Sequence, residues 1–195
     1  YPVLVQFYET HSEGLNTYHA PLLSSAMADV MYFVSNGYIV FMPDVHFTVG
    51  SPGQSSYDAV VSGTKFLIER GIAHPGKIGL QGHSWSGYQA GYLVTKTDIF
   101  TCASIGAPIT DMVTGYLGIR NGSGLPRYFM YEETQSRMGS TLWEAKEKYL
   151  SNSAIMEADK IRTPLLICHN DDDEAVAYEQ GRALYLAMRR LQRPA

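Results

Sequence analysis

The sequence has little of several features that define whole classes of protein. It has only two cysteines, Cys102 and Cys168, too few for a disulfide framework, and both lie in apolar runs where we expect small buried side chains. Charged residues make up 17% of the chain and the net charge is -4, which excludes a basic nucleic-acid-binding domain. No stretch reaches the roughly 18 consecutive apolar residues of a membrane span, and no basic-then-apolar leader opens the chain. We therefore expect no nucleic-acid partner and no membrane partner.

Hydrophobic residues are abundant by comparison. They make up 45% of the 195 residues, which excludes disorder. A globular chain of this length buries roughly 70% of its unfolded surface, and its length predicts one domain over residues 1–195. The chain opens at Tyr1, inside an apolar run and not at Met, so we interpret it as a fragment of a longer chain.

Short apolar runs alternate with longer helical patterns. Five runs bounded by turn residues are predicted as strands, at residues 2–8, 38–42, 77–81, 101–105 and 165–169. Apolar residues at helical spacing predict helices at residues 22–36, 57–68, 85–96 and 178–191. Near-continuous apolar strands are typical of parallel sheets with both faces covered. The alternation predicts an α/β fold with a doubly wound, mostly parallel sheet, whose ligand site lies at the carboxyl ends of the strands.

The segment from Gly106 to Thr141 interrupts this alternation. It is long and rich in glycine, and it contains four aromatic residues, Tyr116, Tyr128, Phe129 and Tyr131. Long loops on a rigid scaffold are often functional. Two interpretations stay open: a surface excursion held to the core by its aromatic side chains, or a lining of the substrate site.

The third predicted strand leads into a run that has the features of a nucleophile elbow, Gly82-His83-Ser84-Trp85-Ser86-Gly87-Tyr88. In an elbow a strand turns sharply into a helix, and small residues on either side relieve the crowding around an exposed serine. The hydroxyl of Ser84 would project above the sheet, and the N–H of Trp85 would bind an oxyanion. The pattern is imperfect, since Ser86 stands where Gly is usual and Gly87 follows it. The competing interpretation is a turn with a helix-capping serine.

Three segments together resemble one family of enzymes. The elbow is similar to a Gly-His-Ser-Trp-Gly-Gly-Tyr motif, and residues 1–8 are similar to a strand that ends in a functional tyrosine. Residues 164–176 are similar to a strand and loop that hold a catalytic aspartate. These motifs are those of the catalytic domain of the prolyl oligopeptidase family (S9), serine peptidases of the α/β-hydrolase fold that include dipeptidyl and acylaminoacyl peptidases. The resemblance covers essentially the whole chain and implies an α/β-hydrolase fold that lacks its last strand.

The resemblance assigns roles to four residues. Ser84 is the nucleophile, and the Trp85 N–H and the Tyr8 hydroxyl stabilise the oxyanion. Aligning the family's His-Gly-x-x-Asp-Asp pattern on His169 places the triad acid at Asp173, 89 residues after Ser84 and in the chain order of α/β-hydrolases. The competing interpretations are an ordinary strand-end tyrosine for Tyr8 and a calcium loop around Asp173, which lacks the usual spaced acidic pattern.

No histidine of the chain lies at the position expected for the general base. In this fold the catalytic histidine follows the acid by about 30 residues, after one further strand. The chain has 22 residues after Asp173, and all six histidines precede it: His11, His19, His46, His74, His83 and His169. We interpret His83 and His169 as structural and expect the base to lie in the longer chain. The fragment alone should be nearly inactive, because loss of a triad member costs on the order of 10⁴ to 10⁶ in rate.

The resemblance also implies an apolar pocket for the substrate side chain next to the scissile bond. Its lining would be Trp85, Ile109, Met112, Tyr116 and Val176, which suits proline, alanine or similar small side chains. Plain core packing of Ile109, Met112 and Val176 is the competing interpretation.

The sequence therefore predicts a serine peptidase that cleaves short peptides through an acyl-enzyme on Ser84, with no metal or organic cofactor. The family resemblance implies further partners in the parent chain, an N-terminal β-propeller domain and a C-terminal strand. The sheet edge left by that strand makes a homo-oligomer possible. Two alternatives stay open. One is an esterase or lipase on the same fold, and the other is a non-catalytic interaction domain that keeps the fold.

Overall fold

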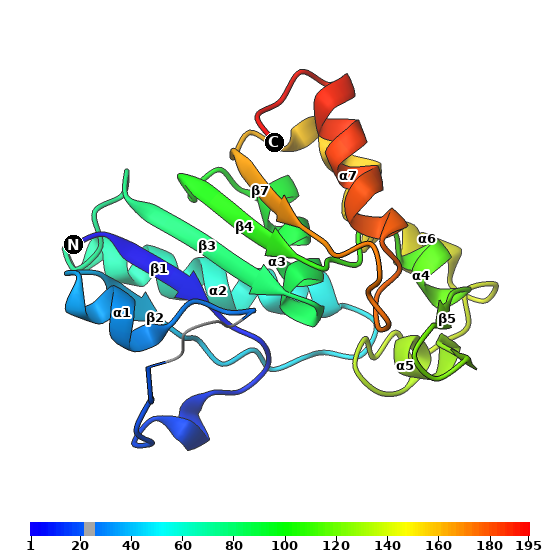
Figure 1. Ribbon diagram of the computed structural model, residues 1–195, viewed down its shortest axis with the longest axis horizontal. Helices are drawn as coiled ribbons and strands as arrows, with labels where there is room; N and C mark the ends of the chain where they lie inside the picture. Colours follow the sequence, from blue (N-terminus) through cyan, green and yellow to red (C-terminus); the bar gives the residue numbers. More distant parts are fainter. Residues whose placement is uncertain (22–25) are drawn as a thin grey trace.

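The central feature of the computed structural model, which describes residues 1–21 and 26–195, is a five-stranded parallel sheet (Figure 1). Its strands run in the spatial order β2-β1-β3-β4-β7. Their bounds are Val3–Gln6 for β1, Ile39–Phe41 for β2, Ile78–His83 for β3, Cys102–Gly106 for β4 and Leu165–Cys168 for β7. Each lies within or overlaps a predicted strand, and the predicted α/β fold is confirmed.

The four predicted helices are also present, one with the predicted bounds and three with different bounds. They are α1 (Val30–Ser35), α2 (Pro52–Glu69), α3 (Trp85–Lys96) and α7 (Glu179–Arg190). α2 begins earlier than predicted because Pro52 occupies its first turn, where the fixed φ of proline suits a helix. α1 is shorter than predicted because the Asp29 carboxylate accepts the Tyr32 N–H at 2.8 Å and caps the helix there. Residues 22–25 of that prediction lie outside the described residues.

The main core lies between the sheet and the helices behind it in Figure 1, α2 and α3. Val5, Leu80 and Ile105 point from β1, β3 and β4 into this layer and are fully buried, against Val60 of α2 and Leu93 of α3. Because side chains alternate across a strand, burying this set fixes the register of the three central strands.

The opposite face of β4 and β7 is open to solvent. Leu166 is 63% exposed on it, and the cysteines Cys102 and Cys168 are exposed as well. The prediction that both cysteines are buried is therefore wrong, because strand alternation turns them away from the face that α2 and α3 cover. β7 is one of the two edge strands of the sheet, and association of two copies through this edge stays a prediction.

The long segment after β4 folds into short elements. These are α4 (Met112–Tyr116), β5 (Ile119–Arg120), β6 (Leu125–Pro126) and α5 (Tyr128–Glu132), followed by α6 (Lys146–Ser151). Two 3₁₀ segments, Ser12–Gly14 and Ala154–Lys160, lie outside it. None of the helices in the described part of the chain is long and apolar enough to cross a bilayer.

A second core, here called the aromatic cluster, holds this segment against α3. Its buried members are Trp85, Tyr88, Tyr92, Ile109, Met112, Tyr116, Tyr131, Met138, Leu142, Tyr149 and Val176. Tyr116 and Tyr131 of the long segment are buried in it, whereas Tyr128 and Phe129 are about half exposed. The aromatic residues thus anchor the segment to α3 through two of the four predicted positions.

Candidate active site

The turn between β3 and α3 has the geometry of an elbow. Ser84 has φ 58° and ψ −117°, a backbone conformation that residues other than glycine rarely adopt and that costs on the order of 1–3 kcal/mol. Two backbone hydrogen bonds hold it there. The Ser84 N–H donates to the Gly106 carbonyl at 2.9 Å, and the Ser84 carbonyl accepts the Tyr88 N–H at 3.0 Å.

Close backbone approaches explain the small residues around Ser84. A Cβ on Gly82 would lie 2.0 Å from the Ser86 carbonyl oxygen, and a Cβ on Gly87 would lie 2.4 Å from the Gly106 carbonyl oxygen. Ser86 fits where glycine is usual because its hydroxyl accepts the His83 N–H at 2.8 Å and donates to the His83 carbonyl at 3.0 Å. The strand–turn–helix geometry is therefore present, and the nucleophilic role of Ser84 stays a prediction.

The two groups predicted to stabilise an oxyanion are the N–H of Trp85, on the elbow, and the hydroxyl of Tyr8, which follows β1. Trp85 is the first residue of α3, where a backbone N–H has no acceptor within the helix. Tyr8 follows the end of β1, and its carbonyl accepts Gln89 Nε2 at 2.8 Å, which ties the end of β1 to α3. The Tyr8 hydroxyl accepts Gln135 Nε2 at 3.2 Å, and this leaves its own proton free to donate elsewhere.

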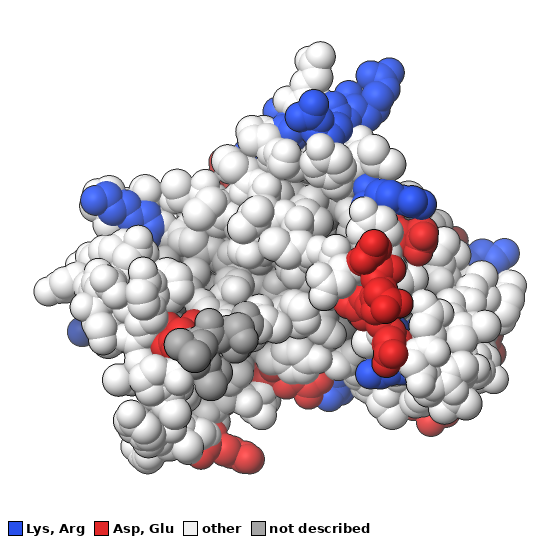
Figure 2. Space-filling model, in the orientation of Figure 1, with Lys and Arg blue, Asp and Glu red and all other residues white. Residues whose placement is uncertain are grey.

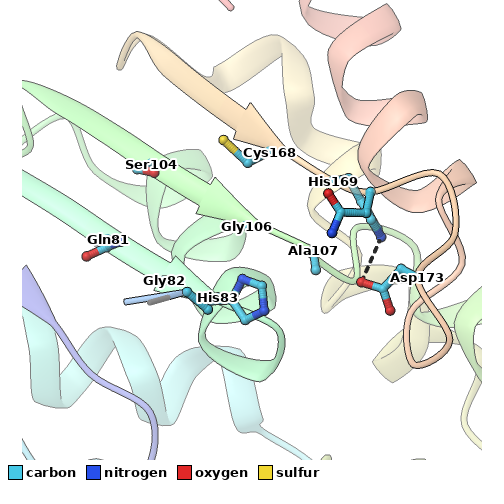
Figure 3. A pocket seen from close by; sticks show the side chains of 11 residues that line it. Gln81, Gly82, His83, Ser104, Gly106, Ala107, Cys168, His169 and Asp173 are labelled. Atoms are coloured by element: carbon cyan, nitrogen blue, oxygen red, sulfur yellow. Dashed lines mark ion pairs between the residues drawn. The ribbon is translucent and has the colours of Figure 1, made fainter. Parts of the chain in front are cut away.

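Asp173 lies on the loop after β7, in an ordered turn. Its Oδ1 accepts the N–H groups of Ala175 at 2.8 Å and Val176 at 2.9 Å. Together with His83 and Gly106 it lines a hollow of about 370 Å³ at the carboxyl ends of β3, β4 and β7 (Figure 3). Gly106 is the residue that binds the Ser84 N–H, so the predicted acid and the predicted nucleophile share one rim of the sheet.

This combination of a parallel sheet, a strained serine and an acid on the same rim agrees with comparisons to known proteins. The sequence model described as the prolyl oligopeptidase family matches residues 24–195. The chain belongs to this family.

Its relatives are longer proteins. The chain is 31% identical over 107 residues to a probable chloroplastic glutamyl endopeptidase of Oryza sativa subsp. japonica, which covers 55% of this chain and 10% of the relative. It is 26% identical over 143 residues to the uncharacterised peptidase YuxL of Bacillus subtilis (strain 168), covering 73% of this chain and 20% of that protein. The chain thus spans a fifth or less of the length of these two relatives.

Solved structures share its fold. An acylaminoacyl peptidase in complex with Z-Gly-Gly-Phe-chloromethyl ketone superposes with a TM-score of 0.73 at 19% identity, covering 99% of this chain and 31% of that one. A puromycin-hydrolyzing peptidase of Mycobacterium tuberculosis gives 0.75 at 18% identity, covering 98% of this chain and 29% of that one. These matches confirm the predicted fold of this prolyl oligopeptidase family member.

The histidines near Asp173 are held by backbone neighbours. His169 is buried, with Nε2 3.0 Å from the Val176 carbonyl oxygen and 3.7 Å from Oδ2 of Asp173. Its Nδ1 faces α7, where a Cβ on Gly181 would lie 2.6 Å away. The His83 ring packs over Gly106, where an added Cβ would meet its Nδ1 at 2.5 Å. Both rings therefore pack between elements, and their interpretation as structural residues stays a prediction.

All five residues of the predicted substrate pocket lie in the aromatic cluster. Trp85, Ile109, Met112, Tyr116 and Val176 are between 0 and 3% exposed. The Trp85 ring stacks on Tyr88 at 4.7 Å between centroids. The structure brings these side chains together, and their contact with substrate stays a prediction.

A small cavity of about 20 Å³ opens beside two of these residues, Ile109 and Val176. Tyr131 and the buried Arg127 also line it. Sequence reasoning did not single out Arg127. The signal present was a basic residue directly before an aromatic run, in a segment whose aromatic side chains were expected to pack.

Buried hydroxyls in the cluster stay protonated at neutral pH. Burial, together with a hydrogen bond from the Tyr116 hydroxyl to Oε1 of Glu132 at 2.5 Å, raises the pKa of Tyr116 to about 12. Burial likewise raises the pKa of Tyr131 far above its ordinary value, against a smaller opposing effect of the Arg127 charge. Both phenols are therefore neutral hydrogen-bond donors, and Tyr131 lines the small cavity.

Proposed function

We propose that this chain is the catalytic domain of a serine peptidase that hydrolyses short peptides through an acyl-enzyme on Ser84. The observation that carries the proposal is the strained backbone of Ser84 at the start of α3, fixed on both sides by hydrogen bonds to Gly106 and Tyr88. A protein retains such strain where a fixed side-chain direction is needed, and an exposed nucleophile needs one.

In the proposed mechanism the Ser84 hydroxyl attacks the scissile carbonyl and its proton passes to a general base. The oxyanion that forms accepts hydrogen bonds from the Trp85 N–H and the Tyr8 hydroxyl, each worth roughly 3 kcal/mol in comparable sites. The amine leaves with the proton from the base, and water then hydrolyses the ester on Ser84. No metal or organic cofactor takes part.

The proposed base is a histidine of the longer parent chain, oriented by the Asp173 carboxylate. This follows from His83 and His169, whose rings are engaged with Gly106, Val176 and Gly181. We further propose that a β-propeller domain and an additional strand complete the parent protein and restrict it to short peptides.

A fluorophosphonate probe tests the proposal on the complete gene product. We expect labelling of the wild type, loss of labelling in Ser84→Ala, and a fall in peptide anilide hydrolysis of at least about 10⁴-fold. Ser123→Ala, on an exposed loop, is the matched control and should label normally. Labelling that persists in Ser84→Ala would contradict the proposal. Hydrolysis of p-nitrophenyl esters without hydrolysis of peptide anilides would support the esterase alternative.

A further inference from the structure

The feature that the proposed mechanism leaves unused is the buried cation Arg127. The side chain comes from the turn between β6 and α5 and is only 6% exposed. Its Nη1 donates to the carbonyl of Ala175, Nη2 lies 3.9 Å from the Met130 sulfur, and Nε is buried without a partner. Among the residues that the structure describes, no carboxylate forms an ion pair with Arg127.

A buried guanidinium without a counter-ion is costly. Taking a charge out of water costs several kcal/mol unless an opposite charge or several hydrogen bonds replace the solvent. One carbonyl and one thioether replace only part of it here. The arginines that form ion pairs in the described part of the chain lie nearer the surface, such as Arg137, which meets Glu9 at 3.0 Å. Arg127 is therefore a buried positive charge that a bound anion would stabilise.

The position of Arg127 indicates where that anion comes from. Arg127 lines the small cavity with Ile109 and Val176, two of the residues predicted to surround the substrate side chain. The carbonyl that it binds belongs to Ala175, whose N–H binds Oδ1 of Asp173. The cation thus stands two hydrogen bonds from the predicted triad acid, beside two residues of the predicted substrate pocket.

We propose that Arg127 is a specificity residue that binds a carboxylate of the substrate, so that the enzyme prefers a glutamate or aspartate side chain directly before the scissile bond. This inference rests on the proposed peptidase function. It replaces the expectation of a purely apolar pocket, because a planar guanidinium presents paired donors that match a carboxylate.

The pocket has to widen to accept such a side chain. Its volume of about 20 Å³ is roughly that of one water molecule. Part of its wall is Ile119, which is 59% exposed on the two-residue strand β5. Gly115 and Gly118, which also line it, carry no side chain to block entry. Ile119 is therefore the exposed part of the wall that has to move.

Acidic side chains around the entrance work against an acidic substrate. Figure 2 shows acidic residues gathered over the loop after β7, where Asp171, Asp172 and Glu174 are exposed. Exposed charges are screened by water and salt, whereas the buried Arg127 acts in a low-dielectric pocket. The attraction between Arg127 and a substrate carboxylate therefore outweighs the repulsion from the exposed acidic residues. Added salt screens that repulsion and should raise kcat/KM for an acidic substrate.

The test compares acetylated and free-amine tripeptide anilides that end in Glu, Gln or Ala, on the complete gene product. Glu and Gln have nearly the same shape and differ in charge. We expect the wild type to cleave the Glu substrate at least about tenfold better than the Gln substrate. Arg127→Met should lower kcat/KM for Glu about 100-fold and change that for Gln by less than about threefold. Arg127→Lys should give an intermediate loss.

The matched control is Arg120→Met, which removes an exposed charge of the same hairpin and should leave the Glu-to-Gln ratio unchanged. If Arg127→Met does not fold, product inhibition of the wild-type enzyme tests the inference instead. The product acetyl-Ala-Ala-Glu should then inhibit more strongly than acetyl-Ala-Ala-Gln. Equal rates for Glu and Gln, or equal losses for both in Arg127→Met, would overturn the inference while Ser84-dependent labelling persists. Absence of that labelling would instead refute the proposed function.

Discussion

Two neighbouring regions of the site are built by different kinds of contact. Around the elbow the contacts join backbone to backbone, since Gly82 approaches Ser86 and Gly87 approaches Gly106 too closely for any side chain. In the segment after β4 the contacts join side chain to side chain. Tyr116 meets Tyr131, Trp143 and Tyr149 edge-on, at 5.1–6.1 Å between ring centroids.

This difference separates two tasks. A backbone contact has almost no freedom to adjust, so it suits the nucleophile, whose direction must be fixed before substrate arrives. The helices of the later segment have five or six residues, which is too short to be stable alone, and they depend on aromatic packing. Packing of that kind tolerates changes in shape, so it suits the wall that selects the substrate. The comparison predicts unequal responses to equally small substitutions.

The largest response is expected at Gly82. In Gly82→Ala the new Cβ would lie 2.0 Å from the Ser86 carbonyl oxygen, and neither backbone can move without breaking the elbow. We expect a loss of more than about 4 kcal/mol in the free energy of unfolding, or no folded protein. Gly124→Ala is the control, with φ +67° and no atom within 4 Å of its Cβ, and should cost about 1 kcal/mol. Denaturant unfolding that gave equal losses would refute the distinction.

The second-largest effect of a substitution is expected at Tyr8, where the two regions meet. Tyr8→Phe removes the proposed oxyanion donor and should lower kcat by roughly 10²–10³ while KM and the melting temperature stay nearly constant. The hydroxyl is positioned by Gln135 of the later segment, so Gln135→Leu should lower kcat by a smaller factor. Steady-state kinetics on one peptide anilide measures both. An unchanged kcat in Tyr8→Phe would assign Tyr8 to packing alone.

The contrast between the two regions also explains which features could be predicted from the sequence. The elbow could be predicted because its close backbone approaches require glycine at set positions near Ser84, here 82 and 87. The apolar runs on either side indicate a strand and a helix. The same reasoning gave the five strands and placed Ser84 at the carboxyl rim of the sheet, whereas the roles of Asp173 and Tyr8 came from the family resemblance. The burial of Cys102 and Cys168 was wrong because an apolar run does not indicate which face of a strand is covered.

The structure of the segment after β4 could not be predicted from the sequence in the same way. Its elements are too short to show a helical or strand period, and the contacts that hold them join residues far apart in the chain. Tyr116 bonds Glu132 sixteen residues away, and Arg127 bonds Ala175 forty-eight residues away. Sequence spacing carries no signal for such pairs, which is why α4, α5, α6 and the buried Arg127 were missed.

A third, smaller response is expected at Ser86, the position at which the elbow departs from the usual glycine. Ser86→Ala keeps the backbone but removes the hydroxyl that accepts the His83 N–H and donates to the His83 carbonyl. We expect a loss of about 1–2 kcal/mol in the free energy of unfolding, because two partly buried backbone groups of His83 lose a partner. Ser123→Ala, on the exposed loop, should be neutral. A neutral Ser86→Ala would mean that sterics alone hold the turn.

The smallest response is expected at Tyr116, and it depends on pH. Tyr116→Phe removes a hydrogen bond to Glu132 and should cost about 1 kcal/mol at neutral pH. The folded pKa of about 12 exceeds the ordinary value near 10, so the folded state holds this proton more tightly than the unfolded state does. Tyr116 therefore causes stability to fall as pH rises from 10 to 12, and Phe at this position removes that contribution. Thermal melts of both proteins from pH 9 upward should converge as the pH increases, whereas Tyr128→Phe, half exposed, should run parallel to the wild type. Parallel curves for Tyr116→Phe as well would show that the phenol titrates normally and that the aromatic packing, without the buried hydrogen bond, determines the stability of this wall.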